Sequence, residues 1–225
     1  MKAAKTKLAT KRGQSRAAAP APKSRASPRA EQAAKRREAI LSAALEEFSA
    51  RGFATARLED VARRAGVAKG TIYLHFRDKE TLFQELVRAE LSPVVAALEA
   101  APVGDLPLRV VAERLVTIFA REIFSTHRKD VIRLVLTEGP RFPAIAEFYY
   151  REVVERVMTV IRGLAERAVA RGELPNDALV RFPQLLGAPG IVAIIWSGLF
   201  DRWARIDVEA FMHAYLDLVF ARRAA

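Results

Sequence analysis

The sequence of 225 residues contains no cysteine. Disulfide bonds, thiolate metal sites and cysteine nucleophiles are therefore excluded, and the composition is compatible with a reducing cytoplasm. The only histidines are His75, His127 and His213, which lie too far apart in the sequence for a metal-binding motif. The HExxH, GxSxG, P-loop and GxGxxG motifs are also missing. We expect no metal site and no cofactor, and the rival interpretation, a helical enzyme, has no catalytic constellation to support it.

Long hydrophobic runs are also missing. The N-terminus lacks the apolar segment of a signal peptide. The most apolar stretch, residues 185–200, is short for a membrane span and is interrupted by Gly187, Pro189 and Gly190. A buried core helix explains this stretch better, so we expect a cytoplasmic protein without a membrane partner.

Acidic residues are absent from residues 1–30, which carry nine lysines and arginines of a chain whose net charge is +11. The segment contains Pro20, Pro22 and Pro28, and Leu8 is its only large apolar side chain. These features predict a disordered basic tail. Such a tail can lie along DNA phosphates or enter a minor groove. The alternatives are a solubilising extension and a wrongly assigned start.

Good helix formers dominate the rest of the sequence, and β-branched residues are scattered instead of gathered in strand-like runs. We therefore expect an all-α fold, with a DNA-binding domain over residues 31–90 and a second helical domain over residues 91–225. Pro93 predicts a kink, and residues 187–190 predict a break. The expected helices cover residues 31–51, 58–65, 69–76, 79–100, 107–127, 129–138, 143–171, 177–203 with a break, and 207–222.

The two short helices expected at 58–65 and 69–76 flank Gly66, which is the arrangement of a helix-turn-helix. In the second of them, Ile72 and Phe76 are four residues apart and share the buried face. The alternative is a structural helix-turn-helix inside an all-helical protein of another kind.

The opposite face of this second helix suits a DNA major groove. Gly70 lets a backbone approach closely, Thr71 can bond a base edge, and Leu74 can contact a thymine methyl group. Tyr73 flanks this face, and Lys69, at the exposed start, can reach a guanine or a phosphate.

The motifs AGV at residues 65–67, KGTIYLHF at 69–76 and DKETL at 78–82 resemble the DNA-binding domain of the TetR family of regulators. The resemblance extends over about 50 residues, from near Ala34 to Leu86. It implies a three-helix DNA-binding head, a divergent ligand-binding domain, and a homodimer that binds a palindromic double-stranded operator. It also implies base contacts from Lys69, Gly70, Thr71 and Leu74, and phosphate contacts from Tyr73, His75 and Lys79.

Lys79 begins the fourth helix, where free backbone N–H groups also favour an anion. The alternative for this residue is a solvated lysine at a helix start. The sequence departs from the family pattern before two helices. Ala56 and Arg57 stand where Ser or Thr is usual, and Ala68 stands where Ser is usual. Thr55 is displaced from that position, so we do not expect it to make the phosphate contact of the usual Ser or Thr. Arg57 can replace that contact electrostatically.

Two C-terminal segments, residues 191–203 and the final helix over residues 207–222, carry more apolar side chains than one core needs. Paired with the same segments of a second copy, they would form a four-helix bundle, which is also how TetR-like proteins dimerise. The alternative is that both segments serve one monomeric core. The residues expected at the dimer interface are Trp196, Phe200, Trp203, Phe211, Tyr215 and Val219.

Aromatic residues between these two regions are candidates for an effector pocket, although each of them is also a candidate for the core. The pocket candidates are Phe119, Phe142, Phe148, Tyr149 and Trp196. With the resemblance, they predict a repressor that releases its operator when a small molecule of unknown identity binds. The alternative is an effector-independent repressor or an architectural DNA-binding protein.

Overall fold

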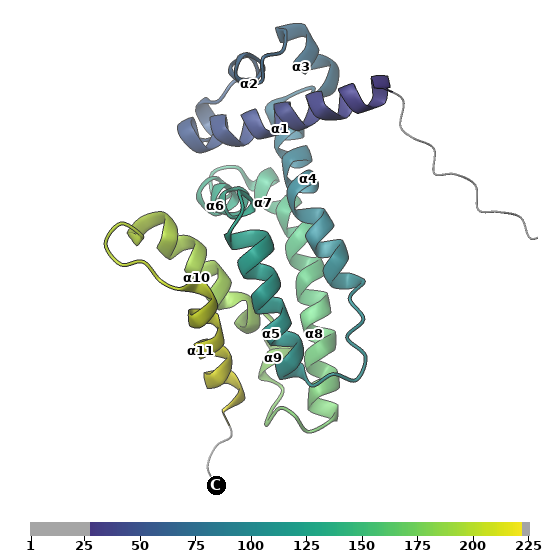
Figure 1. The fold of residues 1–225 in the computed structure, drawn as a ribbon, viewed down its shortest axis with the longest axis vertical. Helices are drawn as coiled ribbons and strands as arrows, with labels where there is room; N and C mark the ends of the chain where they lie inside the picture. Colours follow the sequence, from purple (N-terminus) through teal and green to yellow (C-terminus); the bar gives the residue numbers. More distant parts are fainter. Residues whose placement is uncertain (1–27, 222–225) are drawn as a thin grey trace, which may run out of the picture.

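The computed structural model describes residues 28–221, and within this range it contains helices and no strand (Figure 1). The all-α prediction is confirmed. No helix within the described range is both long and apolar enough to span a membrane. The helices are α1 (Pro28–Thr55), α2 (Leu58–Arg64), α3 (Lys69–His75), α4 (Lys79–Glu99), α5 (Leu108–Ile118), α6 (Arg128–Glu138), α7 (Pro143–Tyr149), α8 (Glu155–Ala170), α9 (Ala178–Arg181), α10 (Gln184–Phe200) and α11 (Val208–Phe220), with π-helical turns η1 (Phe119–Phe124) and η2 (Tyr150–Val154).

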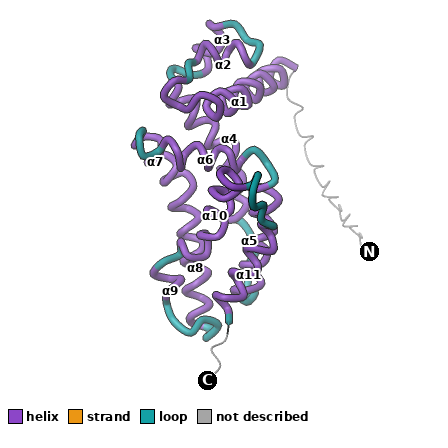
Figure 2. The backbone as a smooth tube through the Cα atoms, turned by 90° about the vertical axis from the view of Figure 1, so that its left-hand side faces the viewer, coloured by secondary structure: helices purple, strands orange, loops and turns teal. Residues whose placement is uncertain are grey.

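The first three helices form a head at one end of the molecule, and the remaining helices form an elongated body (Figures 1 and 2). The predicted tail over residues 1–30 needs a correction, because α1 begins at Pro28. A proline fits the start of a helix, where its missing N–H would have no partner. Residues 1–27 lie outside the described range.

Helix α4 connects the head to the body without interruption (Figure 1). It continues through Pro93, so the domain boundary predicted near residue 90 falls inside a continuous helix. One hydrophobic cluster also runs from the head through α4 to α6, whereas a second cluster fills the far end of the body around α5, α8 and α11. The head therefore shares both a helix and a core with the body.

The break predicted at residues 187–190 is wrong in position. Helix α10 runs through these residues, and the chain breaks instead at Phe182 and Pro183. Pro189 has no N–H to donate to the carbonyl of Leu185, one turn earlier. The hydroxyl of Tyr215 donates to that carbonyl instead, at 2.5 Å. The helix thus tolerates its internal proline because α11 satisfies the free acceptor.

Gly190 within the same helix is required by packing. A Cβ atom at this position would lie 2.9 Å from the ring of Phe119. The glycine therefore serves a close contact between α10 and η1, not a break in the helix.

Candidate nucleic-acid interface

Aromatic side chains hold the head together. The rings of Phe48 and Phe53 lie 5.3 Å apart, and Phe83 of α4 packs against both. Ile72 and Phe76, on the inner face of α3, are buried as predicted. This packing fixes which face of α3 points to solvent.

The turn between α2 and α3 is built as the sequence predicts. Gly66 has a φ of +67°, in the left-handed region that glycine occupies without strain. The N–H of Val67 then donates to the carbonyl of Ala62 at 3.0 Å, which closes the turn. The two short helices and this turn form a helix-turn-helix.

The outer face of α3 is open to solvent. Leu74 is 86% exposed, and Tyr73, His75 and Lys69 are also exposed, while Thr71 is half-buried. Among the described residues, nothing lies within 4 Å of the position that a Cβ atom would take at Gly70. The fold of the chain itself therefore does not require a glycine there, and the free space lies on the face that could meet an external partner.

Two of the predicted DNA contacts share one carboxylate, which sequence reasoning missed. The ammonium of Lys69 lies 3.0 Å from Glu59 Oε1, and the hydroxyl of Tyr73 donates to the same oxygen at 2.9 Å. The backbone N–H of Glu59, followed by Lys69 and Tyr73, lowers the pKa of Glu59 to about 2. Glu59 thus holds the two side chains side by side at the start of α2.

Lys79 has a structural role beside its predicted phosphate contact. Its ammonium donates to the carbonyls of Phe53 and Ala54 at 2.8 and 2.7 Å, and it lies 4.8 Å from the centre of the Phe53 ring. An ammonium has three protons, so one is left for a phosphate. Lys79 therefore ties the end of α1 to the start of α4.

The N-cap of α4 is formed by Asp78, whose carboxylate accepts the N–H of Thr81 at 2.7 Å. This bond, with those from the Thr81 hydroxyl and from Arg77, lowers the pKa of Asp78 to about 2. Asp78 therefore caps the first turn of α4.

Comparison with known families decides the assignment of this head. Residues 40–86 match the model of the bacterial regulatory proteins of the tetR family, and residues 107–219 match that of the tetracyclin repressor-like C-terminal domain. The chain belongs to the TetR family. It is a DNA-binding transcriptional regulator.

Individual relatives agree with this assignment. The chain is 34% identical over 154 residues to the transcriptional repressor BepR of Brucella suis, which covers 65% of this chain and 72% of BepR. It is 29% identical over 146 residues to the regulator SrpR of Pseudomonas putida, covering 65% and 67% of the two chains. Among solved structures, the SmeT–triclosan complex has a TM-score of 0.70 at 21% identity, over 83% of this chain and 90% of that one.

The departures from the TetR pattern before α2 and α3 are visible in the structure. Within the described residues, neither Arg57 nor Ala68 makes a side-chain N-cap hydrogen bond. Arg57 is exposed, and the hydroxyl of Thr55 donates back to the carbonyl of Arg51. Thr55 is therefore engaged within α1, which leaves Arg57 as the side chain at the start of α2 that is free to reach a phosphate.

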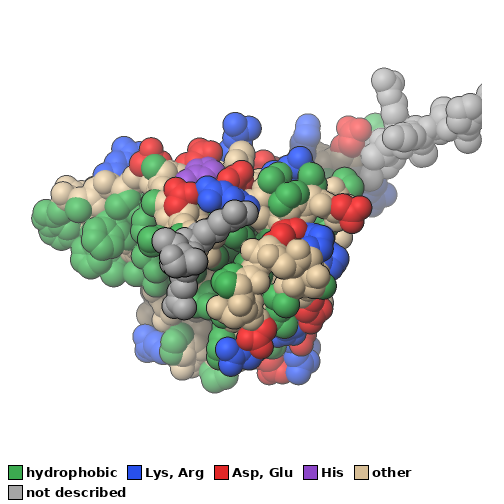
Figure 3. Space-filling view, turned by 90° about the horizontal axis from the view of Figure 1, so that it is seen from below, with side chains coloured by type: hydrophobic (Ala, Val, Ile, Leu, Met, Phe, Trp, Pro, Cys, Tyr) green, Lys and Arg blue, Asp and Glu red, His purple; other side chains and the backbone are tan. Residues whose placement is uncertain are grey.

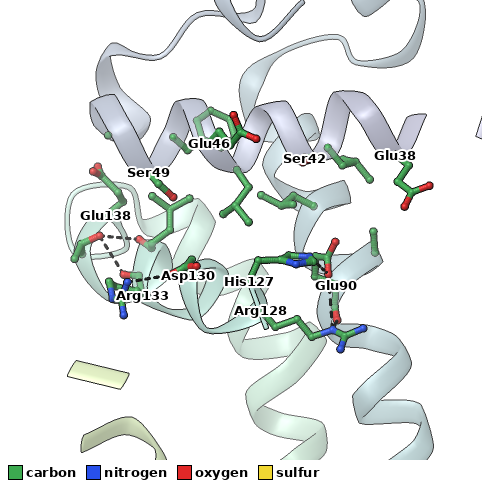
Figure 4. Close-up of a pocket in the computed structure, with 18 of the residues that line it drawn as sticks. Glu38, Ser42, Glu46, Ser49, Glu90, His127, Arg128, Asp130, Arg133 and Glu138 are labelled. Atoms are coloured by element: carbon green, nitrogen blue, oxygen red, sulfur yellow. Dashed lines mark hydrogen bonds and ion pairs between the residues drawn. The ribbon is translucent and has the colours of Figure 1, made fainter. Parts of the chain in front are cut away.

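A groove of about 1230 Å³ lies between α1 of the head and helices α4 and α6 of this TetR-family protein (Figure 4). Its walls come from α1, α4 and α6, and most of its polar side chains form ion pairs. His127 Nε2 lies 2.8 Å from Glu90 Oε2, and Arg128 donates to the Glu90 carbonyl at 2.9 Å. The groove thus combines ion-paired and apolar side chains in its lining, and the sequence pattern did not predict it.

The predicted pocket aromatics pack against other parts of the fold. None of them lines this groove or the cavity between α4, α5 and α8 that is described below. Phe119 packs on Gly190, Phe142 lies 4.9 Å from the Phe53 ring, and the ring of Phe148 is 4.8 Å from the Arg88 guanidinium. Burial raises the pKa of Tyr149 to about 12.

Trp196, the fifth pocket candidate, donates its indole N–H to the carbonyl of Ala204 at 2.5 Å. This bond closes the turn after α10. For all five aromatics, a contact with an effector therefore stays a prediction.

The predicted dimer residues divide into two groups. Phe200 and Trp203 are exposed, and 67% of the Trp203 surface is accessible. Trp196 is half-buried, as are Phe211, Tyr215 and Val219, and the last three pack against the body core. Figure 3 looks at the molecule from the end opposite the head, and hydrophobic side chains gather at the left of this view, the side on which α10 lies in Figure 1. Further exposed apolar residues on α10 and α11 are Leu185, Ile191, Val192, Ile195, Leu199 and Leu218.

Proposed function

We propose that the chain is a cytoplasmic, homodimeric repressor. It binds a palindromic DNA operator through α3 and releases the operator when a small molecule binds the body. The outer face of α3 carries this proposal. Leu74 extends into solvent beside an open Gly70, while Ile72 and Phe76 anchor the opposite face. A rigid helix with an exposed, shape-permissive face fits a major groove.

Roles within the interface follow from position. We assign base contacts to Lys69, Gly70, Thr71 and Leu74 and phosphate contacts to Arg57, Tyr73, His75 and Lys79, because base contacts specify sequence and phosphate contacts position the protein. The basic residues of the N-terminal tail would add phosphate contacts.

The exposed apolar surface of α10 supports the dimer. Leu199 and Trp203 are each more than half exposed in one chain, and contiguous apolar patches of this kind mark interaction sites. A second copy related by a two-fold axis would bury the same patch on both chains. Two heads held in this way match the two half-sites of a palindrome.

Repression and release are supported by relatives. BepR is named a repressor, and the SmeT structure contains triclosan. An enzymatic role is not part of this proposal, since the sequence contains none of the catalytic motifs considered above. The second candidate is an effector-independent repressor.

Footprinting of the DNA upstream of the chain's own gene, with and without candidate small molecules, tests this function. We expect protection of an inverted repeat whose half-sites are about one helical turn apart, and loss of that protection when an effector is added. The proposal fails if the protein shows no sequence-dependent protection. Protection that persists with every compound of a broad library would instead favour the effector-independent repressor.

A further inference from the structure

A cavity of about 340 Å³ lies at the end of the body away from the head, between the end of α4, the middle of α5 and the middle of α8. This volume is at the lower end of the range of about 300 to 1,000 Å³ for small-molecule sites. Most of its lining is apolar and includes Leu98 of α4, Leu115 of α5, and Val160, Gly163 and Leu164 of α8.

Two arginines complete the lining of this cavity without a partner of their own. Arg114 of α5 and Arg167 of α8 are exposed, and neither lies within 4.0 Å of an acidic group among the described residues. Seven of the twelve other arginines described between residues 100 and 221 are paired with a carboxylate. An apolar cavity with two unpaired guanidinium groups has an excess of positive charge at its polar edge.

The one acidic residue in the lining does not cancel this charge. Glu99 accepts two hydrogen bonds from Arg156, at 2.8 and 2.6 Å, and this pairing lowers the pKa of Glu99. The hydroxyl of Thr159 also has a partner, since it donates to the carbonyl of Glu155 at 2.8 Å. Only the two arginines are therefore left to recognise a polar group.

We propose that this cavity binds a small amphipathic anion, an apolar body that carries one carboxylate. The apolar walls would bury the body, and the planar guanidinium groups match a carboxylate through paired N–H donors. Binding of the anion to this cavity does not depend on the proposed function. The further step, that this anion is the effector, rests on the proposed function.

The position of the cavity couples it to the head. Leu98 at one end of α4 lines the cavity, and Lys79 at the other end bonds the carbonyls of Phe53 and Ala54. A ligand that displaces the end of α4 would therefore shift a helix that is fixed to the DNA-binding head. Such a shift changes operator affinity only if the ligand binds the shifted and the unshifted forms of the proposed dimer with different affinities.

Gly163 offers a way to close the cavity without harming the fold. A Cβ atom at this position would meet only the Arg167 guanidinium, at 3.8 Å, among the described atoms. Gly163 lies inside α8, where replacing glycine also favours the helix. The Gly163→Leu variant should therefore fold and fill the space that a ligand would occupy.

Isothermal titration calorimetry on the full chain tests the proposal with decanoate, 1-decanol and decylamine as probes. We expect decanoate to bind at least tenfold more tightly than the alcohol, and decylamine to bind more weakly still. Arg114→Gln and Arg167→Gln should each weaken decanoate binding about tenfold, and Gly163→Leu should abolish it. Arg162→Gln is the matched control, because Arg162 is an exposed arginine of α8 that does not line the cavity.

Equal affinity for decanoate and 1-decanol, or undiminished binding to Gly163→Leu, would overturn the proposal. These comparisons use the wild-type chain and the Gly163→Leu variant, and circular dichroism can verify that the variant is folded. The test therefore stands even if an arginine variant is unstable. Operator binding is measured separately. Decanoate binding that leaves operator affinity unchanged would support the site and contradict its role as effector site, whereas a failure to bind any operator would contradict the proposed function alone.

Discussion

The hydroxyl of Tyr215 donates a hydrogen bond to the carbonyl of Leu185, at 2.5 Å, and so joins α11 to the first turn of α10. Pro189 cannot supply this bond from within α10. Tyr215→Phe removes the donor and leaves the carbonyl without its partner. We expect the free energy of unfolding to fall by about 1 kcal/mol, as measured by urea denaturation.

Tyr150→Phe is the control for this variant, because Tyr150 is exposed and its hydroxyl has no hydrogen-bond partner within the described residues. An equal loss of stability in both variants would show that the Leu185 carbonyl does not depend on Tyr215.

Glu59→Gln removes the carboxylate that Lys69 and Tyr73 share. Because this substitution also removes a negative charge next to the DNA-facing helix, we expect affinity for non-operator DNA to rise severalfold. The preference for operator over non-operator DNA should fall, since Lys69 loses the partner that orients it. Mobility-shift titrations with both DNAs measure the two effects.

Glu80→Gln serves as the charge-matched control, since Glu80 is exposed and forms no ion pair with a described residue. If Glu80→Gln and Glu59→Gln changed the preference equally, the shared carboxylate would have no orienting role.

The pH dependence of this contact has a definite sign. The pKa of Glu59 is lowered from 4.5 to about 2 in the folded chain. The contribution of its ionised form to the stability of the fold is therefore complete above about pH 4.5. It is lost as the pH falls towards 2. Operator preference measured near neutral pH should therefore not depend on the titration of Glu59.

Lys79→Ala should lower both stability and DNA affinity. The substitution removes two hydrogen bonds to the carbonyls of Phe53 and Ala54. We expect the free energy of unfolding to fall by about 1 to 2 kcal/mol. Affinity for all DNA sequences should fall together because the substitution removes the proposed phosphate contact. Tyr73→Ala is the comparison, because Tyr73 is exposed and should affect DNA binding with less effect on stability.

Thermal melts and salt titrations of DNA binding separate these two roles of Lys79. Unchanged affinity and unchanged salt dependence in Lys79→Ala would mean that Lys79 only ties α1 to α4.

The helix-turn-helix could be predicted in detail from sequence because its signals are local. The four-residue spacing of Ile72 and Phe76 identifies the buried face of α3, and Gly66 marks a turn that needs a positive φ. The same holds for Asp78, whose cap involves a residue only three positions away.

The features that sequence reasoning missed depend on partners far along the chain. Pro189 predicts a break unless Tyr215 is known to lie beside Leu185. Lys79 looks like a free cation until the carbonyl of Phe53, 26 residues earlier, lies beside it. The cavity between α4, α5 and α8 has the same origin, because Arg114 and Arg167 acquire a common site only when two helices pack together.

A charge placed on the exposed face of α10 should separate the proposed dimer without unfolding the chain. Leu199 is 59% exposed in one chain, so Leu199→Glu costs little in the monomer and would bury a carboxylate in the dimer. We expect light scattering to report a dimer for the wild-type chain and a monomer for this variant at micromolar concentration. Phe211→Glu should instead unfold the chain, because Phe211 packs against the body core. A wild-type chain that is already monomeric would refute the proposed assembly, and a dimeric Leu199→Glu variant would place the interface elsewhere on the body.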